Sequence, residues 1–435
     1  MKRYIKYIVF VFIIIFIFNC NNSSSDGNSS NTINNTNNTN NTNNTQYDDL
    51  LNYVNIGVVK DINDYGDLTD NGAFTYKSND EVISFINSIQ SQYPHITDVE
   101  KIGESVEGRD IMALTLSDNA GIHEMEPRVR LTGSIHGDEN ISTEVLLRLI
   151  TFLTSNYASD VFIKDLIDSH HIVFIPVLNP DGLYHNTREN VNDVDLNRNF
   201  SEYWTSSSFN PGTSAFSEPE SRAFRDFSLD MYFHLSATYH SGETVINIPY
   251  DYASKESGVY SKEYDMLFSL AKVYSLSGNF LSSPGILALD TVEDGIVNGG
   301  DWYEVGGSLQ DWSLLVTGCI DFTIELIDSK NNHSISQVNQ TYFYNRNAML
   351  SFIKASSIGI SGRVFDGDGN PIEGAEVSIQ GGDIIVYSDE NGFYHKIVLP
   401  GTYTLTVEAS GFVKTSQAVT VESYTPVEGI DFTLQ

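Results

Sequence analysis

The chain has 435 residues, and 57 aspartates and glutamates against 24 lysines and arginines give it a formal net charge of −33. This length suits one large domain followed by a small one. So acidic a surface repels nucleic acid and anionic lipid, which argues against nucleic acid as a partner, and it attracts cationic substrates, although acidity also serves solubility alone.

The N-terminus, residues 1–20, has the pattern of an export signal. Basic residues precede an unbroken apolar run over residues 7–18, which is short for a membrane span and suits a signal-peptide core. The run ends at Asn19-Cys20, which resembles a bacterial lipoprotein signal, with Asn19 where a small residue is usual. We therefore expect an exported protein, either a bacterial cell-envelope lipoprotein anchored through Cys20 or a secreted protein; an apolar segment that stays uncleaved as an anchor is the remaining alternative.

Residues 21–66 are predicted to form a disordered tether and linker. Positions 21–45 consist almost wholly of Asn, Ser and Thr. Such a composition buries too little apolar surface to fold. A lipid at one end and a folded body at the other would make this segment a tether.

Segments with helical spacing alternate with β-rich runs over residues 67–357. We expect a helix over 81–91, a strand over 128–131, a helix that Ser142 caps and that runs to about residue 155, and a buried strand over 171–178. This alternation indicates a layered α/β domain. Cys319 lies in an apolar stretch, so we expect a buried, unreactive side chain.

Residues 358–435 have a different texture. Short strands alternate with turns such as Asp366–Pro371 and Glu390–Gly392, and residues 402–407 alternate polar and apolar side chains. This pattern predicts a small β-sandwich.

The strongest local signal is the run Gly133–Glu139. His136 and Glu139 stand three positions apart where a predicted strand gives way to a helix, so their side chains can converge on one ion. A hydrolytic zinc site usually takes three protein ligands and leaves one position for water. By itself a His-x-x-Glu pair is weak evidence, because such pairs also occur by chance.

One further motif precedes this run and four follow it. They are Ser105–Arg109, Asn179–Gly182, Val194–Phe200, Thr238–Gly242 and Phe322–Leu326. With them the sequence resembles the M14 metallocarboxypeptidases, the carboxypeptidase A-like zinc peptidases, from about residue 76 to residue 353. The resemblance implies that family's mixed central sheet flanked by helices, one Zn²⁺ per catalytic domain, and hydrolysis of the C-terminal bond of peptides and proteins.

The resemblance also implies a metal site. His136, Glu139 and His240 match the zinc ligands, and Asp195 matches a partner that fixes the ring of His136. Neither the ligand set nor the role of Asp195 follows from the spacing of these residues alone.

Five matching residues are implied to carry catalysis and substrate binding. Glu325 would be the general base for the zinc-bound water, and Arg188 would polarise the scissile carbonyl. Asn197 and Arg198 would hold the free C-terminal carboxylate, and Tyr303 would close over bound substrate. Independently of the family, the sequence neighbours of Glu325 are apolar. A carboxylate in such surroundings needs a charged or hydrogen-bonding partner, or a function.

Side-chain preference is the finer question. The stretch Thr244–Asp251 resembles the carboxypeptidase N/E, M and D branch, in which Asp251 and Gln310 would line a pocket for C-terminal Lys or Arg. A carboxylate in a closed pocket suits a cation, but Asp251 could also simply begin a turn. Departures from that branch occur at Asp311–Ser313 and in the motif loops. Arg109 would be either a remote substrate contact or a structural ion-pair partner.

The C-terminal segment supports the same branch. Ile360–Val364 and Pro371–Ala375 resemble the transthyretin-like domain that follows the catalytic domain there. For this domain we expect a role in folding or docking.

Three functions therefore compete. The first is a zinc exopeptidase that releases C-terminal Lys or Arg, the second has the same chemistry on apolar or cell-wall peptides, and the third is an inactive peptide-binding surface lipoprotein. The intact set of His136, Glu139, His240 and Glu325 argues against the third. We expect a monomer that meets a membrane only through an anchor on Cys20.

Overall fold

The computed structural model describes residues 49–54 and 75–435. The predicted signal, Cys20 and most of the predicted tether lie outside these residues. Inside the tether prediction, residues 49–53 are helical, and Leu50 and Val54 are buried in the main core. Residues 49–54 are therefore ordered, in contrast to the prediction for this part of the segment. No helix in the described ranges is long and apolar enough to cross a membrane.

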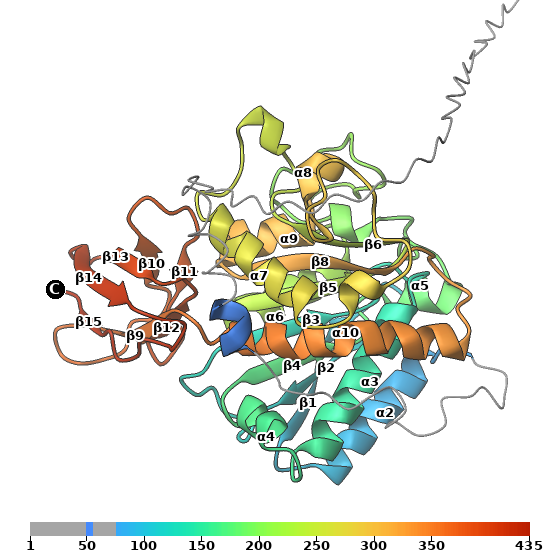
Figure 1. The fold of residues 1–435 in the computed structure, drawn as a ribbon, viewed down its shortest axis with the longest axis horizontal. Coiled ribbons are helices and arrows are strands. Elements are labelled where there is room, and N and C mark those ends of the chain that lie inside the picture. The colour runs from blue at the N-terminus through green and yellow to red at the C-terminus, as the bar shows by residue number, and fades with distance from the viewer. Residues whose placement is uncertain (1–48, 55–74) are drawn as a thin grey trace, which may run out of the picture. The chain divides into compact units, whose positions relative to one another are not determined.

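An eight-stranded mixed sheet forms the centre of the first domain (Figure 1), in the order β1-β2-β4-β3-β5-β8-β6-β7. Its strands are β1 (Thr97–Glu104), β2 (Asp110–Leu116), β3 (Arg128–Thr132), β4 (His171–Ile175), β5 (Leu235–His240), β6 (Glu243–Ile248), β7 (Ile296–Asn298) and β8 (Ile320–Ile327). The four central strands β4, β3, β5 and β8 are parallel, whereas β2 and β6 pair antiparallel to them. The predicted α/β class is thus confirmed.

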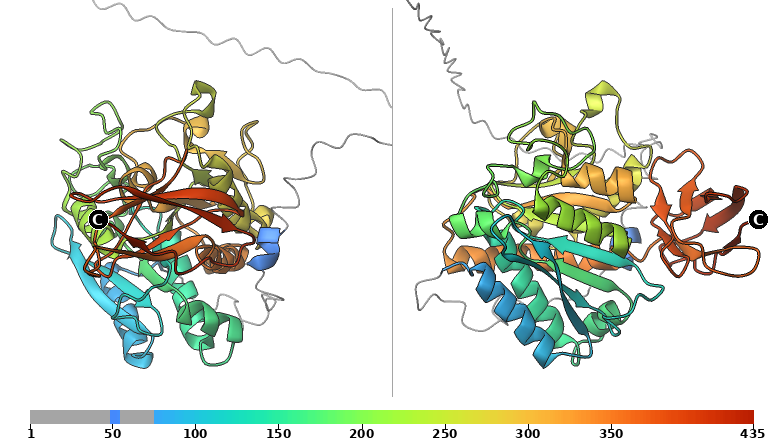
Figure 2. Two further views of the ribbon diagram at one scale, coloured as in Figure 1. Left: turned by 90° about the vertical axis from the view of Figure 1, so that its left-hand side faces the viewer. Right: turned by 180° about the vertical axis from the view of Figure 1, so that it is seen from behind.

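Helices cover both faces of this sheet (Figures 1 and 2). The helices of this domain after residue 75 are α2 (Asn79–Gln92), α3 (Ile141–Asn156), α4 (Val161–Asp168), α5 (Pro180–His185), α6 (Pro219–Met231), α7 (Tyr264–Leu276), α8 (Gly299–Trp302), α9 (Leu309–Trp312) and α10 (Ile335–Ala355). Alternate residues of β4 serve the two faces: Ile172 and Phe174 join a core with α2, α3, α4, α7 and α10, whereas Val173 and Ile175 join one with α6 and α9. Cys319 is buried in the second core, as expected.

The predicted helices and strands have the same type in the structure, but some of them end at other residues. The strand expected over 171–178 ends at Ile175, because Pro176 lacks an N–H for the ladder. The N–H of Leu178 instead donates to the carbonyl of Gly133 at 3.1 Å. This bond fastens the chain after β4 to the loop that carries His136.

The prediction that Ser142 caps a helix is wrong. Helix α3 begins at Ile141 after Asn140, and Ser142 lies within its first turn. The Ser142 hydroxyl donates to the carbonyl of Glu139 at 2.7 Å and accepts the N–H of Ser134 at 2.9 Å. The Ser142 hydroxyl therefore stabilises the loop before the helix and does not cap the N-terminus of α3.

The C-terminal domain is a β-sandwich. One sheet has the order β11-β10-β13-β14 and the other the order β12-β9-β15. The strands are β9 (Ile360–Phe365), β10 (Glu376–Ile379), β11 (Val386–Tyr387), β12 (Phe393–Lys396), β13 (Gly401–Glu408), β14 (Thr415–Val421) and β15 (Phe432–Thr433). Apolar residues from both sheets share one core, which confirms the predicted all-β architecture.

The two domains are joined by apolar and charged contacts. Ile384, Ile397 and Tyr424 of the C-terminal domain belong to the main core of the first domain. Arg128 on β3 forms an ion pair with Asp389, and both side chains are 1% exposed. A charge on a central strand of the sheet therefore has its counterion in the other domain.

Candidate metal and active site

Three neighbouring parallel strands position the site. His136 follows the end of β3 by four residues, His240 is the last residue of β5, and Glu325 lies near the end of β8. In the pairing of β5 with β8, His240 stands directly opposite Glu325. The carboxyl ends of parallel strands are where α/β sheets place their ligands.

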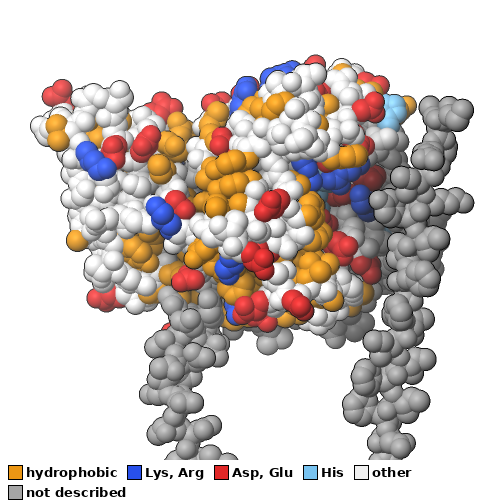
Figure 3. All heavy atoms as spheres, turned by 90° about the horizontal axis from the view of Figure 1, so that it is seen from above, with side chains coloured by type: hydrophobic (Ala, Val, Ile, Leu, Met, Phe, Trp, Pro, Cys, Tyr) orange, Lys and Arg blue, Asp and Glu red, His pale blue; other side chains and the backbone are white. Residues whose placement is uncertain are grey.

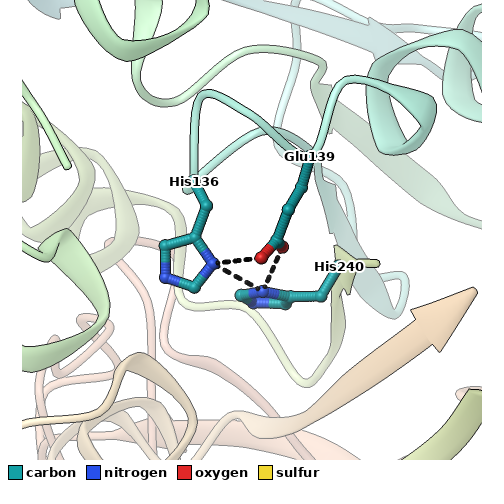
Figure 4. Close-up of side chains that lie close together, drawn as sticks. All are labelled: His136, Glu139 and His240. Carbon is teal, nitrogen blue, oxygen red and sulfur yellow. Dashed lines mark hydrogen bonds and ion pairs between the residues drawn. The ribbon is translucent and has the colours of Figure 1, made fainter. Parts of the chain in front are cut away.

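His136, Glu139 and His240 form one buried cluster (Figure 4). Glu139 Oε1 lies 3.0 Å from His136 Nδ1, and Glu139 Oε2 lies 2.9 Å from His240 Nδ1. The two Nδ1 atoms are 3.1 Å apart. One donor atom from each residue thus lies within 4.8 Å of the other two.

This donor set fits a zinc ion. Two imidazole nitrogens and one carboxylate oxygen are ligand types that zinc accepts, and three protein ligands leave a position open. All three side chains are almost fully buried, so their lone pairs converge on a space shielded from solvent. Among the described residues this is the one group with metal-ligand spacing.

Asp195 lies behind His136, on the side away from the cluster. His136 Nε2 is 3.1 Å from Asp195 Oδ1, which favours the proton on Nε2 and leaves the Nδ1 lone pair directed at the cluster. Burial alone would raise the pKa of Asp195, but His136 and the guanidiniums of Arg198 and Arg188 hold that pKa below its usual value. The residue is therefore a carboxylate.

Arg188 bridges Asp195 and the same cluster. Its Nε donates to Asp195 Oδ2 at 3.1 Å, and its Nη1 lies 3.3 Å from Glu139 Oε1. The guanidinium is thus held beside the three metal-ligand candidates.

The loop that carries His136 and Glu139 is tightly packed. A Cβ at Gly137 would lie 1.9 Å from the carbonyl carbon of Gly182, so only glycine fits there. Ser134 has a φ of 44°, a left-handed conformation that its hydrogen bonds to Ser142 and Thr143 support. These constraints fix the direction of the His136 side chain.

Residues 188–198 carry four of the predicted site residues. Asn190 within this segment and Asn199 directly after it hold the segment against the start of α6. Asn190 donates to Glu218 at 2.9 Å and to Glu220 at 3.2 Å. Asn199 accepts the hydroxyl proton of Ser221 at 2.6 Å. Sequence reasoning gave neither asparagine a role, because their partners are remote in the chain.

Glu325 faces a small cavity of about 30 Å³, which is room for one or two waters. Its lining includes His136, Arg188, Asn197, Arg198, His240, Asp251, Tyr303 and Glu325. Glu325 is 8% exposed, and burial followed by the nearby Glu139 raises its pKa well above the usual value. Eight of the predicted site residues therefore meet around one space.

Asp251 is held at this cavity by residues behind it. Asn247 donates to Asp251 Oδ1 at 3.0 Å, and Gln310 donates to Asn247 Oδ1 at 3.2 Å. The side-chain Oε1 of Gln310 accepts the N–H of Thr323 at 3.0 Å. Gln310 is not part of the cavity wall and acts on Asp251 through Asn247, a lining residue that sequence reasoning did not single out.

Tyr303 separates the small cavity from a larger one. The larger pocket, of about 520 Å³, shares Arg198, Tyr303 and Val305 with the small cavity and is otherwise lined by residues of the 203–209 loop, Tyr252, Glu304 and Gly306. Tyr303 is 47% exposed. Its side chain therefore stands at the mouth of the site.

Comparison with known proteins agrees with this geometry. Residues 82–353 match the family model described as zinc carboxypeptidase, and residues 359–435 match the carboxypeptidase regulatory-like domain. The protein belongs to the zinc carboxypeptidase family. The resemblance to the M14 metallocarboxypeptidases is thereby confirmed, and the chain is a metallocarboxypeptidase by family.

Curated relatives extend over both domains of this carboxypeptidase. The carboxypeptidase N catalytic chain of Mus musculus is 33% identical over 397 residues, which cover 83% of this chain and 86% of that protein. Carboxypeptidase D of Mus musculus is 34% identical over 80% of this chain but only 26% of its own length. Among solved structures, carboxypeptidase A from Helicoverpa armigera shares the fold, with a TM-score of 0.55 at 23% identity over 65% of this chain and 74% of that one.

One predicted residue lies away from the cavity of this carboxypeptidase. Arg109 forms ion pairs with Glu107 and Asp181 and stacks on the ring of Tyr184 at 4.1 Å. It is absent from the lining of the small cavity. Of the two interpretations left open by the sequence, these contacts favour the structural ion pair.

Proposed function

We propose that this carboxypeptidase hydrolyses the C-terminal peptide bond of peptides and proteins and releases Lys or Arg. One observation supports this most: the Arg198 guanidinium and the Asp251 carboxylate line the same cavity as Glu325 and two of the metal-ligand candidates, His136 and His240. A cation for the substrate's carboxylate and an anion for its side chain are what a C-terminal basic residue requires.

Arg198 and Asn197 are the proposed clamp for the free carboxylate. Arg198 is buried and donates from Nη1 to the carbonyl of Asn197 at 2.6 Å, which holds the guanidinium in place. Asn197 Oδ1 accepts the N–H of Leu309 at 2.9 Å. A planar guanidinium can meet a carboxylate with two parallel hydrogen bonds, whereas an internal peptide bond offers no such group.

Asp251 is the proposed determinant of side-chain choice. Burial raises its pKa, which means that the ionised form lacks a full compensating charge. An entering ammonium or guanidinium group would supply that charge. The acidic surface of the protein would also attract such peptides (Figure 3).

Glu325 and Arg188 are the proposed catalytic groups. A zinc ion held by His136, Glu139 and His240 supplies Lewis acidity and lowers the pKa of water. Glu325 takes a proton from the water that adds to the carbonyl carbon and delivers it to the nitrogen of the breaking C–N bond. Arg188 faces the oxygen on which negative charge develops, a contribution of about 3–4 kcal/mol in comparable sites. The products are a shortened peptide and a free amino acid.

Tyr303 is proposed to move during binding. The small cavity and the outer pocket share Arg198, Tyr303 and Val305, so a substrate side chain that enters from the outer pocket passes these residues. Tyr303 is one of them and is half exposed. Its return would close the site over bound substrate and exclude water.

Blocked dipeptides that end in Arg, Lys or Phe test this function. The zinc-loaded protein should release Arg and Lys with a higher kcat/KM than Phe, and a chelator should abolish all three activities. Faster release of Phe would favour the second function, apolar or cell-wall peptides. Absence of release at every C-terminus, with zinc bound, would favour an inactive peptide-binding protein.

Export and anchoring at Cys20 are proposed from the sequence alone. Expression in a bacterium with a labelled fatty acid should label the protein, and Cys20→Ser should remove the label. A monomer is the expected state, which size-exclusion chromatography with light scattering measures. Residues 67–357 and 358–435 are the proposed domain limits.

A further inference from the structure

The C-terminal domain contacts the segment that carries Asp251. Tyr250, the residue before Asp251, is 4% exposed, and its hydroxyl donates to Asp383 Oδ2 at 3.3 Å. Asp383 lies in the loop between β10 and β11 of the β-sandwich. One hydrogen bond thus joins the second domain to a residue next to the proposed specificity group.

The Asp383 carboxylate is itself held firmly. The Ser261 hydroxyl donates to its Oδ1 at 2.8 Å, and the N–H of Lys262 donates to its Oδ2 at 2.8 Å. In return, Glu263 of the first domain accepts the N–H groups of Asp383 and Ile384 at 3.2 and 2.8 Å. The two domains therefore exchange hydrogen bonds in both directions at this loop.

A buried ion pair fixes the same junction. Lys396 on β12 lies 2.8 Å from Glu263 Oε1, with side chains 1% and 6% exposed. Lys396 Nζ also donates to the carbonyl of Ile384 at 2.9 Å. The loop that contains Asp383 is therefore anchored on both sides.

On its other side, the segment 250–252 supports the cavity. Asp311 accepts the N–H of Asp251 at 2.9 Å and that of Tyr252 at 3.0 Å. The N–H of Gly300 donates to the carbonyl of Tyr250 at 2.8 Å, and the N–H of Val305 donates to that of Asp251 at 2.9 Å. The stretch 300–305, which includes Tyr303, is thus fastened to the segment that Asp383 contacts.

We infer that Asp383 is a positioning residue through which the C-terminal domain sets the place of Asp251 and of the Tyr303 stretch. The inference rests on the proposed function, because Asp251 matters only if it receives a basic side chain. Small displacements of a binding group are costly, since a misplacement of about 1 Å can cost up to about a hundredfold in rate. The single hydrogen bond from Tyr250 is the direct link.

The test compares four full-length, zinc-loaded variants: Asp383→Asn, Tyr250→Phe, the double variant, and Asp368→Asn. Asp368 lies in an exposed turn of the same domain and is the matched control. We expect KM for the Arg-ended dipeptide to rise about three- to tenfold in both single variants, with a smaller change in kcat and little change for the Phe-ended dipeptide. The double variant should show less than the sum of the two single effects, because both changes act on the contact between Tyr250 and Asp383, whereas Asp383→Asn also alters the bonds from Ser261 and Lys262.

Hydrogen exchange of the peptide 247–254 gives a readout that does not depend on activity. Exchange should be faster in Asp383→Asn than in Asp368→Asn. A wild-type protein without preference for Arg, together with faster exchange in Asp383→Asn, would overturn the proposed function and leave the positioning role intact. Unchanged KM and unchanged exchange in Asp383→Asn, in a protein that does prefer Arg, would overturn the inference, and so would a change confined to the melting temperature.

Discussion

His240 on β5 and Glu325 on β8 are direct partners in the parallel pairing of the two strands, so a metal-ligand candidate and the proposed base share one register position. Adjacent strands lie about 4.8 Å apart. Their spacing is therefore set by the backbone ladder of the sheet and does not depend on a flexible loop. Several expectations about the site depend on this arrangement.

Glu325→Gln should retain zinc and lose turnover. The amide keeps the shape of the side chain but cannot accept the proton, so kcat should fall by about 10²–10⁴-fold. Metal analysis and kinetics on the same sample measure both quantities. Glu243→Gln, on the neighbouring strand β6, is the control and should retain activity. Comparable turnover in Glu325→Gln would remove this residue from its role.

Asp251→Asn should lower the preference for basic side chains. The change leaves an incoming cation unpaired in a buried pocket, which costs about 2 kcal/mol or more, or about thirtyfold in kcat/KM for the Arg-ended dipeptide. Activity on the Phe-ended dipeptide should fall much less. A parallel loss on both substrates would show that Asp251 supports the fold of the pocket and not its selectivity.

The preference for Arg over Phe should depend on pH. Because burial raises the pKa of Asp251, its ionised form is lost at a higher pH than for an ordinary aspartate. As the pH falls through that raised pKa, kcat/KM for the Arg-ended dipeptide should decline faster than for the Phe-ended one. The ratio of the two, measured between about pH 8 and pH 5, cancels titration of groups common to both reactions. In Asp251→Asn the ratio should be flat.

Zinc should stabilise the fold through the buried cluster. A ligand present at about a thousandfold excess over its Kd adds about 4 kcal/mol to the free energy of unfolding. Chelation should therefore lower the melting temperature, and His240→Ala should reduce the difference between metal-free and zinc-loaded protein. An equal difference in His240→Ala and wild type would place the stabilising metal elsewhere.

Two buried histidines at the domain junction should make stability depend on pH. His234 accepts the N–H of Arg128 at Nδ1, at 2.9 Å, and its ring is 5.2 Å from that of His395. Burial lowers the pKa of His395 to about 4 and that of His234 well below its usual value. Both are neutral in the fold, whereas they are protonated in the unfolded chain below about pH 6.5.

The stability that neutral His395 contributes is complete above about pH 6.5 and is lost as the pH falls towards about 4, at about 1.4 kcal/mol per pH unit. Denaturant titrations across this range measure the slope. The free energy of unfolding of His395→Gln should depend less steeply on pH than that of the wild type. His95→Gln, a control at an exposed site, should show the same slope as the wild type.

The motifs of the sequence predicted the site and its supporting residue Asp195, but other supporting residues were missed. His136 and Glu139 are close in the chain, and the motif around His240 was recognisable, so the cluster could be foreseen. The position of Gln310 behind Asn247 could not, because family spacing identifies a pocket residue without stating which atoms line the cavity. The roles of Asn190 and Asn199 likewise depend on partners about 20 to 30 positions away.

Element types were predictable from periodicity, and element ends were less so. The apolar run 171–178 continues beyond β4, because residues 176–178 are buried in a loop and not in a strand. Ser142 matched the residue type of a helix cap but lies within the first turn of α3, where its hydroxyl donates to the carbonyl of Glu139. In both cases burial and hydrogen bonding outside the element decided the outcome.

The ion pair between Arg128 and Asp389 limits how far the enzyme can be shortened. A truncation at residue 357 would leave a guanidinium inside the sheet without its counterion and would uncover the apolar surface that Ile384 and Ile397 now cover. Loss of one partner of such a buried pair commonly costs about 3–5 kcal/mol. A minimal version therefore needs the whole β-sandwich, or an apolar residue of similar volume in place of Arg128 and new polar residues on the uncovered face.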